Sequence, residues 1–189
     1  YVFLFVLFGT LLEVTGATAF VISWTRRIFR NSPGGAAKVA VVASGLMGSL
    51  SGSAVANTAT TGTFTIPLMK SSGFRPRVAA AIEAAASSGG ALAPPVMGAA
   101  AYMMLEIISP AVTYLEIIRS ALIPACLYYY SLLLLVHLFA HREGVQQIQA
   151  IERRTAVSYW SWEGCVFLGS VVLLVVVLIM GFTPFRAVT

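Results

Sequence analysis

The chain has 189 residues, of which 58% are hydrophobic and only 10% charged, and its mean hydropathy is +0.87. A typical soluble domain carries about 25% charged residues, so this composition excludes a soluble globular protein. The net charge of +5 comes from basic residues that separate apolar runs instead of forming a patch, which indicates membrane orientation and not nucleic-acid binding.

The first predicted element is a transmembrane helix from Val2 to Trp24, which at about 34 Å would cross a hydrocarbon core of about 30 Å. Basic residues close to the end of a span mark the cytoplasmic side, and here they follow at Arg26, Arg27, Arg30 and Lys38. We therefore expect residues 1–37 to form a helix that enters from outside and a cytoplasmic turn.

Residues 38–70 contain two apolar arms that are interrupted at Ser51-Gly52-Ser53. The arms form either one long kinked crossing or a re-entrant hairpin that dips to mid-membrane and returns. A crossing would place Lys70, Arg75 and Arg77 outside, whereas a hairpin keeps them inside. The positive-inside rule therefore favours the hairpin.

Residues 71–110 are predicted to form a discontinuous transmembrane helix that reaches the outside near Ser109-Pro110. Two interruptions fall in the middle of its apolar run, at Ser87-Ser88-Gly89-Gly90 and at Pro94-Pro95. Glycine loosens a helix and each proline removes a backbone donor, so a continuous helix through these residues is not expected.

Three further segments complete the predicted topology. Residues 111–142 should contain an outer interfacial stretch, from Val112 to Ser120, and then a helix that returns inward. Residues 143–162 are predicted to be a cytoplasmic connector, and residues 163–189 to begin a helix that crosses outward. The basic clusters agree with this single arrangement of spans.

Interrupted helices at membrane depth indicate a function, because unpaired backbone there costs several kcal/mol per group unless protein or water satisfies it. Secondary transporters use broken helices to hold an anionic substrate and a coupling cation. Ser51, Ser53 and Asn57 offer the hard oxygen ligands that such a site needs. The alternative interpretation is close helix packing, with Gly48 and Gly52 as a GxxxG pattern.

Two acidic residues lie inside apolar segments, Glu13 in the first span and Glu83 about one turn before the second interruption. Carboxyl groups are expensive in lipid and usually face protein or a cavity. Either residue is a proton or cation site, or a hydrogen-bonded packing anchor, and the sequence leaves both interpretations open.

Three stretches of the chain resemble the large membrane subunit of TRAP transporters, and especially the fused permeases of the TAXI branch. They are SGLMGSLSGSAVAN at 44–57, TGTFTIPLMK at 61–70 and AIEAAASSGGALAPPVMGAAA at 81–101, and the likeness continues at 121–125. The resemblance implies a secondary-active importer, a symporter of the bacterial or archaeal inner membrane that an extracytoplasmic substrate-binding protein supplies. It implies an all-α elevator fold in which two inverted repeats each contribute a hairpin and a discontinuous helix.

The resemblance also implies a site for Na⁺ and, beside it, a site for a small organic acid such as glutamate or 2-oxoglutarate. The implied metal residues are Ser51, Ser53, Asn57, Ser87, Ser88, Gly89 and Gly90, and the implied substrate-binding residues are Ser53, Asn57, Pro94 and Pro95. Many dicarboxylate and sialic acid relatives carry Asp where this chain has Asn57, so H⁺ in place of Na⁺ stays open.

We expect the 189 residues to be a fragment, the first inverted repeat of a larger protein, and not to transport alone. The second repeat and a small four-helix subunit, fused before Tyr1, would be missing. The alternative function is a channel or pore-lining subunit with a re-entrant selectivity loop. An enzyme is not expected, because the sequence contains no HExxH, no GxSxG and no paired aspartates.

Overall fold

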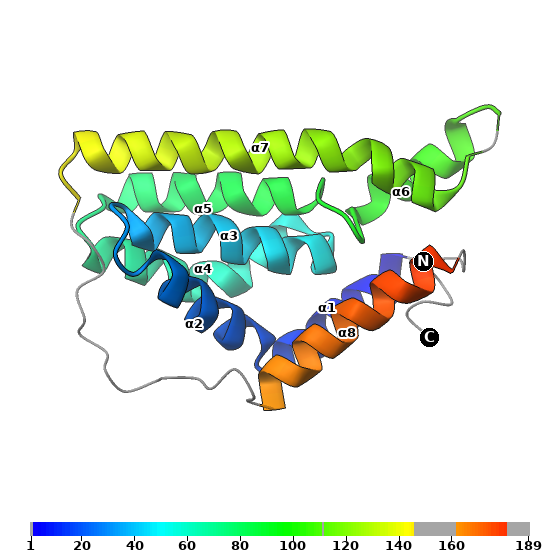
Figure 1. Cartoon of the computed structure of the whole chain (residues 1–189), viewed down its shortest axis with the longest axis horizontal. Coiled ribbons are helices and arrows are strands. Elements are labelled where there is room, and N and C mark those ends of the chain that lie inside the picture. Colours follow the sequence, from blue (N-terminus) through cyan, green and yellow to red (C-terminus); the bar gives the residue numbers. More distant parts are fainter. Residues whose placement is uncertain (1, 111, 146–161, 181–189) are drawn as a thin grey trace.

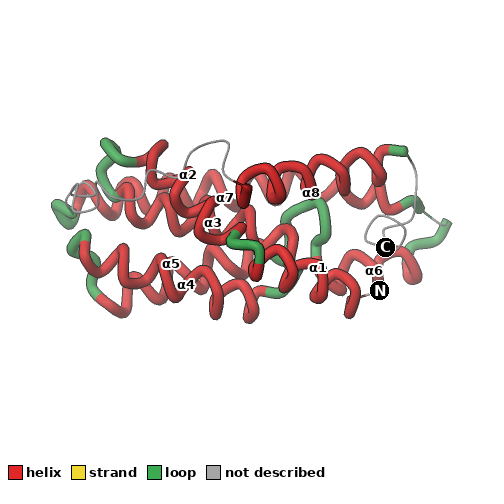
Figure 2. Tube along the Cα trace, turned by 90° about the horizontal axis from the view of Figure 1, so that it is seen from below, coloured by secondary structure: helices red, strands yellow, loops and turns green. Residues whose placement is uncertain are grey.

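The computed structural model describes residues 2–110, 112–145 and 162–180. Within these residues the chain forms helices and no strand, so the predicted all-α class is confirmed. The helices are α1 (Val2–Val14), α2 (Ala17–Phe29), α3 (Gly35–Ser51), α4 (Ala54–Ser71), α5 (Pro76–Gly90), α6 (Gly98–Ile107), α7 (Tyr114–Arg142) and α8 (Trp162–Ile179). Figures 1 and 2 show α2 to α5 and α7 side by side, with α1, α6 and α8 toward the other end.

The prediction of one uninterrupted helix from Val2 to Trp24 is wrong. The apolar run divides into α1 and α2, each about 20 Å long, at Thr15 and Gly16. Gly16 has a φ of 84° in the left-handed region, which ends a right-handed helix and which glycine adopts at little cost.

The arms of the predicted hairpin are α3 and α4, which pack against each other and run in opposite directions (Figure 1). The turn consists of Gly52, whose φ of 62° again suits glycine, and Ser53. The Ser53 hydroxyl accepts the Ala56 N–H at 3.3 Å and so caps the start of α4. The sequence Ser-Gly-Ser therefore turns the chain back on itself, as expected.

The discontinuous helix consists of α5 and α6, and α5 packs against both arms of the hairpin. The predicted interruption at Ser87 to Gly90 is wrong, because these residues form the last turn of α5. The non-helical segment is 91–97, which contains Pro94-Pro95. The prolines break the helix, whereas buried glycines allow it to continue.

The predicted interfacial stretch at Val112 to Ser120 is also wrong, because α7 runs without interruption from Tyr114 to Arg142. A capping box starts it: the Thr113 N–H donates to Glu116 Oε2 at 2.8 Å, and the Glu116 N–H donates to the Thr113 hydroxyl at 3.4 Å. Among the described helices α7 is long and apolar enough to cross a membrane, and shorter apolar helices span Gly35–Ser51, Gly98–Ile107 and Gly164–Leu178.

The last predicted crossing corresponds to α8, which packs against α2. The ring centroids of Phe20 and Phe167 lie 6.2 Å apart at this contact. Most of the predicted connector, residues 143–162, and the chain after Met180 lie outside the described residues.

Basic residues gather where α2, α4 and α7 end and where α3 and α5 begin (Figure 1). Lys38 Nζ donates to His137 Nδ1 at 2.9 Å, and Arg75 pairs with Glu143 at 3.5 Å. The rings of Phe74 and Phe139 stack at the same end, 6.3 Å apart. Both ends of the hairpin therefore lie at the same, basic end of the bundle.

Candidate functional site

The turn of the hairpin lies directly against the non-helical segment that follows α5. The Val96 N–H donates to the Ser49 carbonyl at 3.1 Å, which joins the segment to the end of α3. A Cβ on Gly52 would lie only 2.7 Å from the Gly98 nitrogen, so the two backbones touch. The two interruptions that the sequence singled out, far apart along the chain, are neighbours in space.

Four helix ends meet at this junction. The carbonyl ends of α3 and α5 arrive there at Ser51 and Gly90, and the N–H ends of α4 and α6 leave from it at Ala54 and Gly98. The carbonyl end of a helix carries partial negative charge and the N–H end partial positive charge. The junction therefore offers both polarities, which suits a cation and an anion held close together.

Three tyrosines of α7 bind this region through their hydroxyl groups. Tyr114 donates to the carbonyls of Pro95 and Val96, at 3.0 and 2.8 Å, and so supports the non-helical segment. Tyr128 and Tyr129 donate to the carbonyls of Ala85 and Ala86 in α5, at 2.7 and 3.0 Å. The tyrosines thus fix α7 to α5 and to the non-helical segment that follows it.

The close-packing interpretation of the glycines also has support in the structure. A Cβ on Gly48 would lie 2.7 Å from the Gly90 Cα, and a Cβ on Gly90 would lie 2.6 Å from the Gly48 Cα. Only glycine at both positions allows α3 and α5 to cross this closely. Gly90, an implied metal residue, therefore has a packing role. Gly89 has one too, because a Cβ there would collide with the ring of Tyr128.

The implied metal residues at the tip differ in their surroundings. Ser51 and Ser53 are partly buried in the turn, and the Ser53 hydroxyl already caps α4. Asn57 is 1% exposed, and its Nδ2 donates to the Ser44 carbonyl at 2.8 Å. Its Oδ1 is buried with no hydrogen-bond partner. A buried oxygen without a donor is costly, so this atom fits a ligand for a cation.

The serines at the end of α5 face in different directions. Ser87 is fully buried, and its hydroxyl donates to Glu83 at 3.2 Å. Ser88 is exposed, and its hydroxyl donates to the Ala84 carbonyl at 2.7 Å. The structure therefore brings Ser87, and not Ser88, into the buried polar interior between α5 and the hairpin.

That interior is a cluster of hydroxyl groups around Glu83, whose side chain is 0% exposed. Both oxygens of its carboxyl group accept hydrogen bonds, and the donors come from α3, α4 and α5. They are Ser44 at 2.6 Å, Thr61 at 2.5 Å, Thr65 at 2.5 Å and Ser87 at 3.2 Å. We call these five residues the Glu83 cluster.

Within the described residues, no Lys or Arg nitrogen lies within ion-pair distance of Glu83. Nor do three His, Cys or carboxylate side chains gather there as most transition-metal sites would require. Glu83, one of the two acidic residues that the sequence singled out, is hydrogen-bonded. The side chain of the other, Glu13, lies outside the described part.

The sequence contained part of the signal for this cluster. Thr61 and Thr65, like Glu83 and Ser87, are spaced four residues apart and share a helix face. Ser44 lies in a third helix, α3, and no local sequence pattern predicts that its side chain points toward Glu83. Ser44, Thr61 and Thr65 were therefore not predicted as partners of the carboxyl group.

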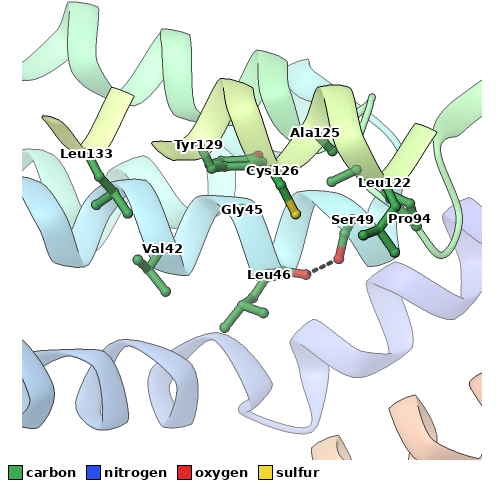
Figure 3. Close-up of a pocket in the computed structure, with 11 residues that line it drawn as sticks. Val42, Gly45, Leu46, Ser49, Pro94, Leu122, Ala125, Cys126, Tyr129 and Leu133 are labelled. Atoms are coloured by element: carbon green, nitrogen blue, oxygen red, sulfur yellow. Dashed lines mark hydrogen bonds between the residues drawn. The ribbon is translucent and has the colours of Figure 1, made fainter. Parts of the chain in front are cut away.

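A cavity of about 330 Å³ lies between α3, α7 and the non-helical segment (Figure 3). Its lining is apolar, and its two hydroxyl groups are engaged, Ser49 with the Leu46 carbonyl at 2.9 Å and Tyr129 with the Ala86 carbonyl. Of the four implied substrate-binding residues, Pro94 alone lines it. Such a cavity does not suit an organic anion, which needs charged or polar donors.

The outer faces of α7 and α8 expose large apolar side chains. On α7, Leu127 is 61% exposed and Leu138 is 59% exposed, and on α8, Leu173 is 63% exposed. Contiguous apolar faces of this extent mark contact with lipid or with another protein. Together with α7, which is long and apolar enough to cross a membrane, these faces are compatible with a helical membrane protein.

Comparison with known proteins identifies the family. Residues 1–189 match the family described as the tripartite ATP-independent periplasmic transporter, DctM component, and the chain belongs to it. It is 33% identical over 91 residues to the 2,3-diketo-L-gulonate TRAP transporter large permease protein YiaN of Escherichia coli K12, a match that covers 48% of this chain and 21% of that protein. It is 27% identical over 154 residues to the uncharacterized protein YgiK of Salmonella typhimurium LT2, covering 82% of this chain and 35% of that protein. The matches therefore span between about a fifth and about a third of these relatives' length.

Proposed function

We propose that this chain forms the first inverted repeat in the large membrane subunit of an ion-coupled, secondary-active importer of small organic acids. The observation that carries the proposal is the contact between the hairpin turn at Gly52 and Gly98, where α6 begins after the non-helical segment. In such an importer the hairpin and the discontinuous helix would move together against a fixed scaffold, as an elevator.

The helix ends at the junction support the chemistry of this proposal. The N–H ends of α4 and α6 would attract the carboxylate of a substrate, beside Ser53 and Asn57. The carbonyl ends of α3 and α5, with the unpartnered Asn57 Oδ1, would bind Na⁺. Pro94 and Pro95 would shape the segment between them. Because one repeat supplies half of such a site, the second repeat would provide the remaining ligands.

The partners follow from the family to which the chain belongs. An extracytoplasmic binding protein would deliver the substrate, and a small membrane subunit would complete the scaffold in the inner membrane. The name of YiaN, with which the chain shares 33% identity over 91 residues, refers to the transport of a sugar acid. This name supports a small carboxylate as substrate, and 2-oxoglutarate and glutamate belong to the same chemical class.

Uptake into proteoliposomes tests the proposal. The full-length protein with its small subunit and its binding protein would be reconstituted and given labelled 2-oxoglutarate, glutamate or 2,3-diketogulonate. We expect accumulation of at least one of them when Na⁺ or H⁺ is higher outside, and none without the binding protein. Accumulation that depends on neither the Na⁺ gradient nor the H⁺ gradient would contradict ion-coupled transport.

A further inference from the structure

We infer that the Glu83 cluster is itself a binding site for a small monovalent cation of the Na⁺ type. The inference rests on the proposed function and deepens it. It assigns the coupling cation to side chains of α3, α4 and α5 that lie farther from the tip than Asn57. Neither Glu83 nor Ser44, Thr61 and Thr65 belongs to the residues that the family resemblance implied.

The charge of the Glu83 carboxylate supports a monovalent cation. Glu83 is 0% exposed, and hydroxyl groups are its only described partners. A carboxylate away from water is strongly unfavourable unless a positive charge compensates it. One carboxylate balances one monovalent cation, whereas a divalent cation would leave an uncompensated positive charge in the same place.

The number and kind of oxygen atoms in the cluster also suit a cation. The two carboxylate oxygens and the four hydroxyl oxygens lie in one place, the hydroxyls at 2.5 to 3.2 Å from the carboxyl group. Carboxylate and other hard oxygen donors are the ligands that hard cations prefer. A hydroxyl carries one proton and two lone pairs, so it can turn from donating to Glu83 to coordinating a cation.

Two of the hydroxyl groups, those of Thr61 and Thr65, have a second hydrogen-bond acceptor within reach. Thr61 Oγ1 lies 2.7 Å from the Asn57 carbonyl, and Thr65 Oγ1 lies 3.0 Å from the Thr61 carbonyl. When a cation enters, both hydroxyl groups can rotate so that each O–H donates to one of these carbonyls, which leaves the oxygen lone pairs facing the ion. The cluster is thus able to stabilise Glu83 in two states, with hydroxyl donors or with a cation.

The cluster adjoins the tip of the hairpin through Asn57. Asn57 lies one helical turn before Thr61 and donates to the backbone of Ser44, so its amide adjoins the cluster from the side of the turn. Its unpartnered Oδ1 is the next buried oxygen toward the tip. A cation bound at the cluster would join both arms of the hairpin to α5, which would couple ion binding to the position of the hairpin.

Binding of Na⁺ to the purified full-length transporter tests this inference. Scintillation binding of ²²Na⁺, and thermal unfolding in NaCl against choline chloride of equal ionic strength, would be measured without substrate. We expect saturable binding and stabilisation by Na⁺ in the wild type. Glu83→Gln, which keeps the shape and removes the charge, should bind fewer Na⁺ per transporter and should be stabilised less by Na⁺. Ser87→Ala should weaken binding by about tenfold or more, whereas Ser131→Ala, on an exposed part of α7, should not change it.

A second pair of variants covers the case in which Glu83→Gln does not fold. Thr65→Val removes a ligand with little change in shape and should weaken binding, while Thr63→Val, on the exposed side of α4, should not. Unchanged Na⁺ binding in Glu83→Gln, Ser87→Ala and Thr65→Val would overturn the inference, as would a wild type that Na⁺ neither binds nor stabilises. If uptake nevertheless follows an ion gradient, the proposed function stands while the Glu83 site fails.

Discussion

The crossing of α3 and α5 gives a prediction with a magnitude. Gly90→Ala adds one methyl group whose carbon would lie 2.6 Å from the Gly48 Cα and 3.0 Å from the Gly48 carbonyl carbon. Ordinary contacts of this kind begin at about 3.4 Å, so the helices must separate by several tenths of an ångström. Overpacking of this kind costs about 1–3 kcal/mol, and both neighbours are backbone atoms that cannot rotate away.

The assay is thermal unfolding of the full-length protein in detergent, with Gly169→Ala as the matched control. A Cβ on Gly169 would meet nothing within 4 Å, so that variant should be neutral or gain up to about 1 kcal/mol from the better helix propensity of alanine. We expect Gly90→Ala to melt at a lower temperature than both the wild type and this control. Equal melting of the two variants would refute the close crossing of α3 and α5.

Three further predictions concern the junction and the topology. Asn57→Leu removes the unpartnered Oδ1 and should abolish Na⁺-dependent uptake by the complete transporter; unchanged uptake and ion dependence would contradict the tip site. Tyr114→Phe should destabilise by about 1–3 kcal/mol, because two carbonyls outside the helices lose their donor, and more than Tyr129→Phe, whose partner lies within α5. Cysteines placed at Ser72 and Ser109 should react with impermeant reagents from the inside and the outside, respectively.

The cysteine experiment needs a background in which Cys126 and Cys165, both exposed, are replaced by serine. Reaction of the two engineered cysteines from the same side would reject the predicted topology. For the tyrosine pair, equal unfolding temperatures would mean that Tyr114 does not support the segment before Gly98.

The sequence was informative where a local rule decides the structure. The turn at Gly52 and Ser53 could be predicted because a left-handed glycine followed by a serine cap ends one helix and starts the next. The break at Pro94-Pro95 could be predicted because proline lacks the backbone donor that a helix requires.

Where competing local signals met, the predictions were wrong. Gly16 lies inside the apolar run that was predicted to be one helix, yet its left-handed φ separates α1 from α2. Thr113 and Glu116 form a capping box that could have placed the start of α7, but the charged residues that follow suggested an interfacial stretch. Ser87 to Gly90 suggested an interruption, whereas packing against α3 and α7 allows the helix to continue.

The candidate site was predictable in part for the same reason. The polar tip and the second break each have a local signature, and their contact agrees with the expectation that interrupted helices meet. The Glu83 cluster depends on how three helices rotate about their axes, which tertiary packing decides. No spacing within one segment could have assigned Ser44 to Glu83.

The most direct test of ion-coupled import is a dual-isotope flux measurement. Proteoliposomes with the full-length protein, its small subunit and its binding protein would receive ²²Na⁺ and a ¹⁴C-labelled organic acid together. We expect Na⁺ to enter in a fixed ratio to the acid. The influx of Na⁺ should be slower without the acid, and the influx of the acid should be slower without Na⁺. Rapid Na⁺ entry that does not depend on the acid would indicate a channel and would contradict the account.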